Sequence, residues 1–409
     1  MKETKQVRRL GIRASLPPDP SSEEQLKLYM RAGFNILTMT EDFVRAKSKA
    51  YLDCLRRCER LGLDVYVRGY PADIGDYYEK HFTGVDFNDY PAVTGFYVLD
   101  EPSLNDIDAV ARYVPWFNDR YAQTGKNFYL NTYCGTNEGQ IGDSVTDYMN
   151  LLMQKIYNKL NTENKYLTID EYPLRRGMDG KAYLDGREWI PYTALTAKIC
   201  RDNGVRFGAY MQTFGGGYCD ARRPLTIEEL RFMAYVYLAF GAQHLGYFVY
   251  MSSGEWDFLG IVDEGGKPTD LYYLVRKLNE ELLSFDVEYL SYDWKGALVV
   301  DGAKNETPNK EFIQTREFLP YTDAELAEVK AEKDLIVGCF EKGKNECAYI
   351  VVSYGEPTVR EGNVVELIFK TAKKLSVQRN GVKETVEIKD GKLKLEMKQG
   401  EGIYIQTLK

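Results

Sequence analysis

Two hydrophobic periods alternate along the first 285 residues, and this alternation restricts the fold more than any other feature of the sequence. Short apolar runs of the kind that form strands are each followed by a stretch in which apolar residues recur every three or four positions, as on one face of a helix. Eight such units predict a (β/α)8 barrel, which typically takes roughly 250 residues. The predicted strands are 9–15, 35–40, 64–70, 96–101, 127–133, 166–170, 205–212 and 243–251.

An open, doubly wound sheet is the alternative architecture for alternating strands and helices. Such a sheet would need about six strands and a glycine fingerprint after the first strand. Arg13–Pro17, at the end of the first predicted strand, contains no glycine. The barrel is therefore the favoured prediction.

The pattern changes from about residue 286. After a polar stretch, 304–333, short alternating runs follow one another, separated by turn signals such as Asn380-Gly381 and Asp390-Gly391. This pattern predicts a small all-β sandwich. We expect three parts: a catalytic (β/α)8 barrel over 1–285, a connecting segment over 286–330, and a β-sandwich accessory domain over 331–409.

Charge and hydropathy exclude several classes of partner. The net charge is −8 and no basic stripe is present, which argues against nucleic acid and against an anionic membrane surface. No apolar run approaches the roughly 20 residues that span a bilayer. Met1–Leu10 is polar and basic and has no apolar core, so it is not a secretory signal. We expect a cytoplasmic protein, or an exported one whose signal peptide is absent from this sequence; the oligomeric state stays open.

Few residues are suited to metal or triad chemistry. The only histidines are His81 and His244, which nearly excludes histidine-based zinc sites and a Ser-His-Asp triad. The seven cysteines include no Cys-x-x-Cys pair, and no cofactor is expected. The 32 tyrosines suit sugar faces, because a rigid ring with a polar tip matches C–H patches rimmed by hydroxyls. Simple packing at strand–helix junctions is the alternative for most of them.

Two predicted strands end in adjacent carboxylates. Asp100 and Glu101 follow an apolar strand, and Asp170 and Glu171 occupy the same place after another. In a parallel barrel the carboxyl ends of the strands form the active-site rim. Two carboxylate pairs on one rim predict acid/base chemistry on a sugar. Helix caps and loop ion pairs are the alternative explanation for such residues.

The other strand ends supply polar and aromatic side chains that suit a hydroxyl-binding pocket. A glycine run, Gly215–Gly217, lies where barrels often bind phosphate and gives a weaker alternative. The predicted catalytic residues are Glu101 and Glu171. The predicted substrate-binding residues are Arg68, Tyr70, Asp100, Asn131, Asp170, Tyr172, Gln212, Tyr250 and Trp256.

Several segments resemble clan A glycoside hydrolases, and most of all the family 42 β-galactosidases and their unclassified relatives. The matching segments are Ala32–Asn35, Phe96–Pro102, Ile169–Pro173, Tyr210–Thr213 and Gly260–Pro268, with Gly400–Gly402 in the tail. The resemblance implies a glycoside hydrolase that acts on a glycan or oligosaccharide.

Position by position, the resemblance implies a role for four residues. Glu101 matches the acid/base residue, and Asp100 stands where the clan usually has Asn. Tyr172 matches a tyrosine that lines the sugar pocket. Gln212 stands where the clan has its nucleophilic Glu, and an amide cannot form the glycosyl ester.

The second carboxylate is therefore open. We favour Glu171, although it could instead only anchor Arg175 or Arg176 in the following loop. Asp170 and Glu171 are neighbours on a strand and should face opposite ways. The other possibilities are a shifted alignment at Gln212 and a catalytically silent carbohydrate-binding barrel.

Overall fold

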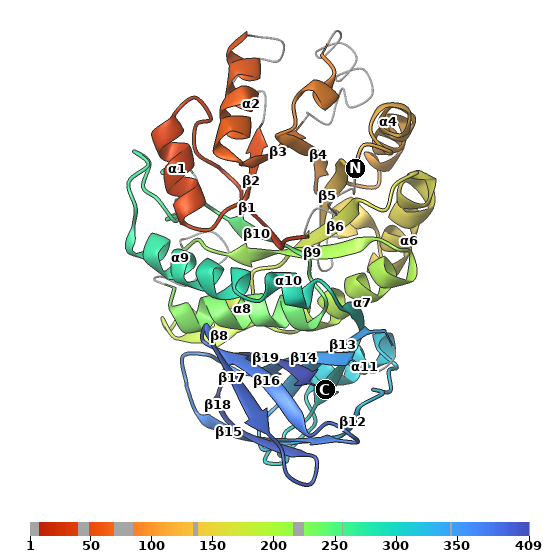
Figure 1. Cartoon of the computed structure of the whole chain (residues 1–409), viewed down its shortest axis with the longest axis vertical. Coiled ribbons are helices and arrows are strands. Elements are labelled where there is room, and N and C mark those ends of the chain that lie inside the picture. The colour runs from red at the N-terminus through yellow and green to blue at the C-terminus, as the bar shows by residue number, and fades with distance from the viewer. Residues whose placement is uncertain are drawn as a thin grey trace.

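The computed structural model describes residues 8–39, 49–68, 85–133, 138–215, 225–255, 257–343 and 346–408. Its first part is built on one sheet of eight parallel strands in the order β1-β10-β9-β6-β5-β4-β3-β2. This order confirms the predicted barrel, followed by antiparallel sheets at the carboxyl end (Figure 1). The strands are β1 (Gly11–Ala14), β2 (Ile36–Met39), β3 (Asp64–Arg68), β4 (Val93–Asp100), β5 (Asn127–Tyr133), β6 (Lys165–Asp170), β9 (Arg206–Gln212) and β10 (His244–Phe248).

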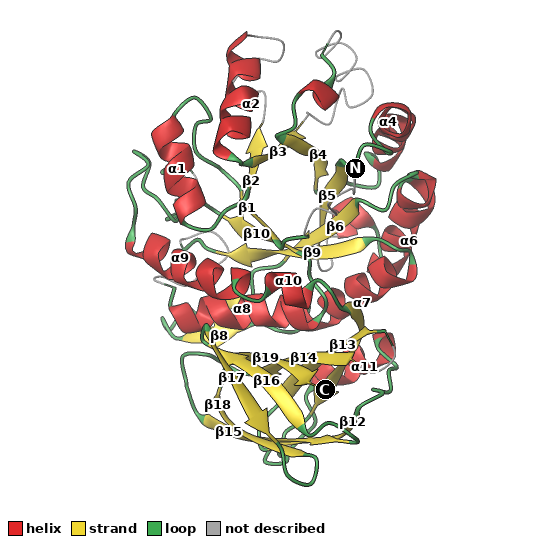
Figure 2. Cartoon of the chain, in the orientation of Figure 1, coloured by secondary structure: helices red, strands yellow, loops and turns green. Residues whose placement is uncertain are grey.

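Helices cover the outside of this sheet (Figure 2). Their starts follow ordinary capping chemistry: Ser22 and Ser144 each accept a main-chain hydrogen bond, and Thr226 forms a capping box with Glu229. The main helices are α1 (Glu23–Arg31), α2 (Lys49–Leu61), α4 (Ile107–Arg120), α6 (Val145–Lys155), α7 (Trp189–Asp202), α8 (Ile227–Ala239) and α9 (Asp270–Leu283). Helix α4 contains Pro115 and continues through it to Arg120. The short elements are η2 (Phe87–Asp89), α5 (Glu138–Ile141), η3 (Tyr157–Lys159) and α10 (Asp286–Tyr289), with a hairpin of β7 (Leu174–Arg176) and β8 (Ala182–Leu184).

Two side chains and one main-chain hydrogen bond, from the Asn35 N–H to the Ile12 carbonyl at 3.0 Å, close the barrel between β1 and β2. The Asn35 amide accepts from the Ile12 N–H at 2.7 Å and donates to the Leu10 carbonyl at 2.8 Å. The Tyr29 hydroxyl accepts from the Ala14 N–H at 2.9 Å and donates to the Ile36 carbonyl at 2.8 Å. These side chains satisfy main-chain groups that a strand ladder would otherwise pair.

Tyrosine rings fill much of the barrel interior. Tyr97, Tyr129 and Tyr166 stand in register on β4, β5 and β6, and all three are buried. Gly246 leaves room for a further ring, since a Cβ there would lie 2.6 Å from Tyr210. Part of the tyrosine content therefore serves packing inside the barrel.

Residues 293–408 form two antiparallel sheets with a core of their own. The six-stranded sheet has the order β11-β13-β14-β19-β16-β17, and the three-stranded sheet has the order β12-β15-β18. The elements of this part of the chain are β11 (Asp293–Val300), α11 (Lys310–Phe318), β12 (Leu326–Ala331), β13 (Leu335–Lys342), β14 (Glu346–Ser353), β15 (Gly362–Phe369), β16 (Lys374–Arg379), β17 (Val382–Glu387), β18 (Lys392–Lys398) and β19 (Gly402–Leu408). The segment predicted as a connection, 286–330, thus contains α10, β11, α11 and most of β12.

Helix α8 joins the two parts of the chain. It lies between the barrel strands and the sheet formed by β13, β14 and β19 (Figure 1). Almost every residue of α8 from Glu229 onward is buried, as expected for a helix that is apolar on all sides. The approach is close enough to require Gly338, where a Cβ would lie 2.2 Å from the Ala239 carbonyl oxygen.

Candidate active site

The backbone turns sharply at Glu101, immediately after β4. Glu101 has a φ of 48°, in the left-handed region that costs a non-glycine residue about 1 kcal/mol. Its N–H donates to the Asn131 carbonyl on β5 at 2.9 Å, and Pro102 then prevents further strand pairing. Strained residues of this kind concentrate at functional sites.

Glu101 and Asp170 form a carboxyl pair. A hydrogen bond between the two side chains lowers the pKa of Glu101 and raises that of Asp170. Burial is the main cause that raises the pKa of Glu101, followed by the charge of Asp100. The pKa of Asp170 is raised well above its ordinary value, first by burial and then by Glu101. Two neighbouring carboxyl groups do not both ionise easily, so their titration belongs to the pair and not to either residue alone.

Asp100 has a different environment from its neighbour. One carboxylate oxygen accepts from Asn131 Nδ2 at 3.0 Å, and the other accepts from Arg68 at 3.3 Å. Asn131 is almost fully buried, whereas the Asp100 side chain keeps 38% of its surface exposed. Asn131 therefore holds Asp100 from below, Arg68 holds it from the exposed side, and the carboxylate faces outward.

Two phenols border the carboxyl groups. Burial, followed by the charges of Glu101 and Asp170, raises the pKa of Tyr133 to about 12. Tyr172 has a raised pKa, caused by burial and then by Asp170. Its ring packs against Phe214, with centroids 5.0 Å apart. The structure thus brings together six of the predicted residues: Arg68, Asp100, Glu101, Asn131, Asp170 and Tyr172.

Glu171 lies on the other side of the strand, where the structure does not bring it to Glu101. Its carboxylate lies 3.6 Å from Arg175, which is the arrangement that the sequence left as the alternative to catalysis. Burial, opposed by the charge of Arg175, raises the pKa of Glu171 to about 7. The residue borders a separate pocket of about 460 Å³ lined by Glu171, Arg175, Asp185, Arg187, Glu188, Tyr192 and Gln314.

Gln212 and Tyr250 also lie apart from the carboxyl pair. The Gln212 amide is fully buried, accepting from the Leu174 N–H and donating to its carbonyl, both at 3.0 Å. Tyr250 is buried against Tyr29 and Phe34. The contacts that the structure shows for these two predicted substrate-binding residues are therefore structural ones.

Two predicted substrate-binding residues, Tyr70 and Trp256, lie outside the described residues, as do Gly216 and Gly217 of the glycine run. Within the described ranges, no group of three or more His, Cys, Asp or Glu side chains could hold a metal ion. None of the helices in those ranges is both long and apolar enough to cross a bilayer.

The sequence prediction missed the layer beneath the site. Thr168 donates to Asn131 and contacts the Tyr129 hydroxyl, which in turn accepts from Arg13. One signal was present in the sequence: Arg13 stands between the apolar residues Ile12 and Ala14 in the middle of the first predicted strand.

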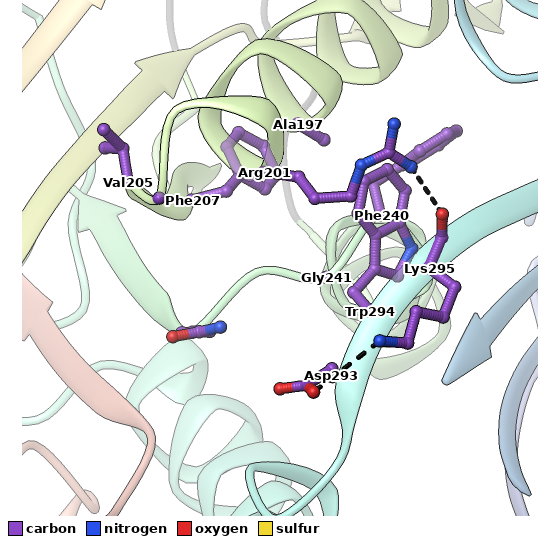
Figure 3. A pocket seen from close by; sticks show the side chains of 11 residues that line it. Ala197, Arg201, Val205, Phe207, Phe240, Gly241, Asp293, Trp294 and Lys295 are labelled. Carbon is purple, nitrogen blue, oxygen red and sulfur yellow. Dashed lines mark hydrogen bonds and ion pairs between the residues drawn. The ribbon is translucent and has the colours of Figure 1, made fainter. Parts of the chain in front are cut away.

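A second pocket lies at the opposite ends of the barrel strands (Figure 3). It has a volume of about 350 Å³ and is lined by Val205 and Gln243, which precede β9 and β10. Arg201 covers one face of the Trp294 ring, and Gly241 approaches the same ring closely. This pocket contains none of the site carboxylates and has no part in the site described above.

No protein-family model and no curated protein sequence matches the chain. Solved structures do match it. A GH42 β-galactosidase from G. stearothermophilus aligns over 99% of both chains with a TM-score of 0.58 and 9% identity. The chain shares the fold of GH42 β-galactosidases. The β-galactosidase from the psychrophilic Marinomonas ef1 aligns with a TM-score of 0.52 and 10% identity over 70% of this chain and 62% of that one. At these identities the likeness is one of fold, and at that level it confirms the resemblance found in the sequence.

Proposed function

We propose that the protein is a glycoside hydrolase that cleaves an O-glycosyl bond of a glycan or oligosaccharide, with Glu101 as the proton donor. The observation that carries this proposal is the Glu101–Asp170 pair at the carboxyl ends of β4 and β6. The pKa values of both groups are raised, which is the direction that favours a general acid. The fold of GH42 β-galactosidases makes β-galactosides the first substrates to test.

In the proposed reaction, Glu101 gives its proton to the glycosidic oxygen as the bond from that oxygen to the anomeric carbon breaks. Asp170 shares a proton with Glu101, so that Glu101 is protonated again before the next turnover. Water adds to the anomeric carbon and releases one proton, which restores the pair. No net redox change occurs, and the products are the free sugar and the alcohol of the leaving group.

Asp170 is unsuited to be a separate nucleophile. Carboxyl groups in hydrogen-bond contact lie closer than the roughly 5 Å of retaining enzymes or the roughly 6.5–9.5 Å of inverting ones. Gln212 cannot form a glycosyl ester, and its amide is engaged by Leu174. Asp100 is the remaining carboxylate that acts on Glu101, and it faces outward.

We assign substrate contact to Asp100, and the first-formed anomer decides its role. Proton NMR that shows inversion would make Asp100 the residue that activates water. Retention would leave Asp100 as a hydroxyl ligand.

A screen of chromogenic glycosides tests the proposal. Glu101→Gln should lower kcat/KM by about 10²–10⁴-fold, the usual contribution of a general acid, while sugar binding is kept. Glu163→Gln, the same change at an exposed residue just before β6, is the matched control and should keep full activity. Full activity of Glu101→Gln would refute the assignment. Loss of activity in Glu171→Gln alone would restore Glu171 as the catalytic partner.

A catalytically silent carbohydrate-binding barrel is the second candidate. The observation that favours it is Gln212, a fully buried amide at the position where the family resemblance implies a nucleophile. Saturable binding of sugars without turnover of any glycoside would support this candidate over the hydrolase.

A further inference from the structure

Arg13 places a guanidinium in the barrel interior. The residue lies on β1 and is 1% exposed. Its guanidinium lies over three rings, at 4.4 Å from Tyr97, 4.5 Å from Tyr129 and 4.8 Å from Tyr210. Within the described part of the chain, it has no ion pair with a carboxylate. Burying a charge without a counter-charge is costly, so its presence calls for a reason beyond packing.

A continuous chain of hydrogen bonds runs from Arg13 to the site. Arg13 Nη2 lies 2.9 Å from the Tyr129 hydroxyl, which lies 2.8 Å from Thr168 Oγ1. Thr168 Oγ1 lies 2.8 Å from Asn131 Oδ1, and Asn131 Nδ2 lies 3.0 Å from Asp100.

The Tyr129 hydroxyl accepts from both Arg13 and Thr168. The Thr168 hydroxyl also lies within hydrogen-bond distance of Asn131 Oδ1 and of the Leu130 carbonyl, and the Asn131 amide nitrogen donates to Asp100. Tyr129 and Asn131 are therefore held by partners on both sides. Hydrogen bonds in such a network strengthen one another in a low-dielectric interior.

The chain of hydrogen bonds ends at Asp100, which acts directly on Glu101. Its charge is the first cause after burial that raises the pKa of Glu101. Whatever fixes the position and charge of Asp100 therefore sets the acidity of the carboxyl pair. Arg68 holds the other oxygen of Asp100 from the exposed side, whereas the Arg13 chain holds it from below.

We propose that Arg13 is a positioning residue that acts through Tyr129, Thr168 and Asn131 to orient Asp100 and to set the proton affinity of the Glu101–Asp170 pair. The inference rests on the proposed function for its effect on turnover. Its effect on the proton affinity of the pair does not depend on turnover.

The pair faces groups from several elements, and each contributes to its titration. Arg13 acts on the pair through Asp100, so its effect is smaller than that of a directly paired cation. The groups are Asp100 on β4, Arg68 on β3, Tyr133 on β5, Tyr172 after β6 and Tyr148 on α6.

Three variants test the proposal. Arg13→Met removes the charge and the donors at similar length, Arg13→Lys keeps the charge, and Thr168→Val interrupts the chain at constant shape. The readouts are the pH profile of kcat/KM and the ¹³C NMR titration of the labelled Asp and Glu carboxyl groups. Losing a positive charge raises carboxyl pKa values, so Arg13→Met should shift both the profile and the titration upward by about half a pH unit or more. Arg13→Lys should recover most of that shift.

A purely structural role predicts a different result. Folded Arg13→Met with lower activity but an unmoved pH profile and titration would overturn the proposal. If Arg13→Met does not fold, Thr168→Val carries the test, because it should shift the titration while leaving Arg13 in place. Absence of turnover in the unmodified protein would refute the proposed function, while the NMR titration would still decide the role of Arg13.

Discussion

Replacing Gly338 by alanine tests how tightly the β domain is bound to the barrel. A Cβ at this position would lie 2.2 Å from the Ala239 oxygen, 2.6 Å from its Cα and 2.7 Å from its carbonyl carbon. All three are backbone atoms of α8, so no side-chain rotation can relieve the contact. An ordinary contact of about 3.4 Å or more would require α8 and β13 to separate by about 1 Å. Overpacking of this kind typically costs 1–3 kcal/mol, and we expect about 3 kcal/mol here.

Urea unfolding followed by circular dichroism measures this loss in the free energy of unfolding, and a thermal melt measures the accompanying fall in melting temperature. At roughly 2–4 °C per kcal/mol, the melting temperature should fall by about 6–12 °C. Gly362→Ala is the matched control, since a Cβ there meets nothing within 4 Å; it should be neutral or slightly stabilising. Equal unfolding free energies for the two variants would refute the claim that Gly338 is required by the close approach of α8.

Two further predictions concern stability. Burial raises the pKa of Glu171 to about 7 from an ordinary 4.5. The stability that the protonated Glu171 contributes is therefore intact below about pH 4.5, and about 3 kcal/mol of it is lost as pH rises through 7. Glu171→Gln should gain stability relative to the unmodified protein between pH 4.5 and pH 8, and an identical difference in urea unfolding at both pH values would contradict this. Asn35→Ala removes the side-chain partners of the buried Ile12 N–H and Leu10 carbonyl. We therefore expect the free energy of unfolding to fall by about 2–4 kcal/mol and hydrogen exchange at Ile12 to become faster. Unchanged exchange at Ile12 would show that barrel closure does not depend on Asn35.

The barrel could be predicted because its strands and helices carry clear periods. The β domain was harder. Strand β17 (Val382–Glu387) is largely exposed and polar, so it shows little of the alternation that marks a half-buried strand. β11 and β12 begin before the region where that alternation is continuous, and β11 and most of β12 lie within the segment predicted as a connection.

The site could be predicted as a set of strand ends but not as a set of contacts. Because side chains alternate between the two faces of a strand, Asp170 and Glu171 are expected to face opposite ways. The preceding residues of β6 show which way each one faces. Thr168 shares the side of Asp170 and lies in the barrel, whereas Ile169 shares the side of Glu171 and packs against the helices. Polar and apolar residues thus alternate along β6 in the sequence itself. The partner of Gln212, in contrast, is Leu174 in the β7–β8 hairpin, a segment without a helical or strand period in its sequence.

The side chains that close the barrel also bear on the order in which the chain is made. The ladder partner of β1 is β10, with Gly11 opposite His244, so it is synthesised more than 200 residues later. Tyr29 and Asn35 bond to β1 from only 15 and 23 residues away. Short loops close with little entropy loss, whereas pairing across a long stretch of chain is slow. The first strand therefore has local partners as it leaves the ribosome, and it can be held by α1 and β2 until the strand that completes its ladder arrives.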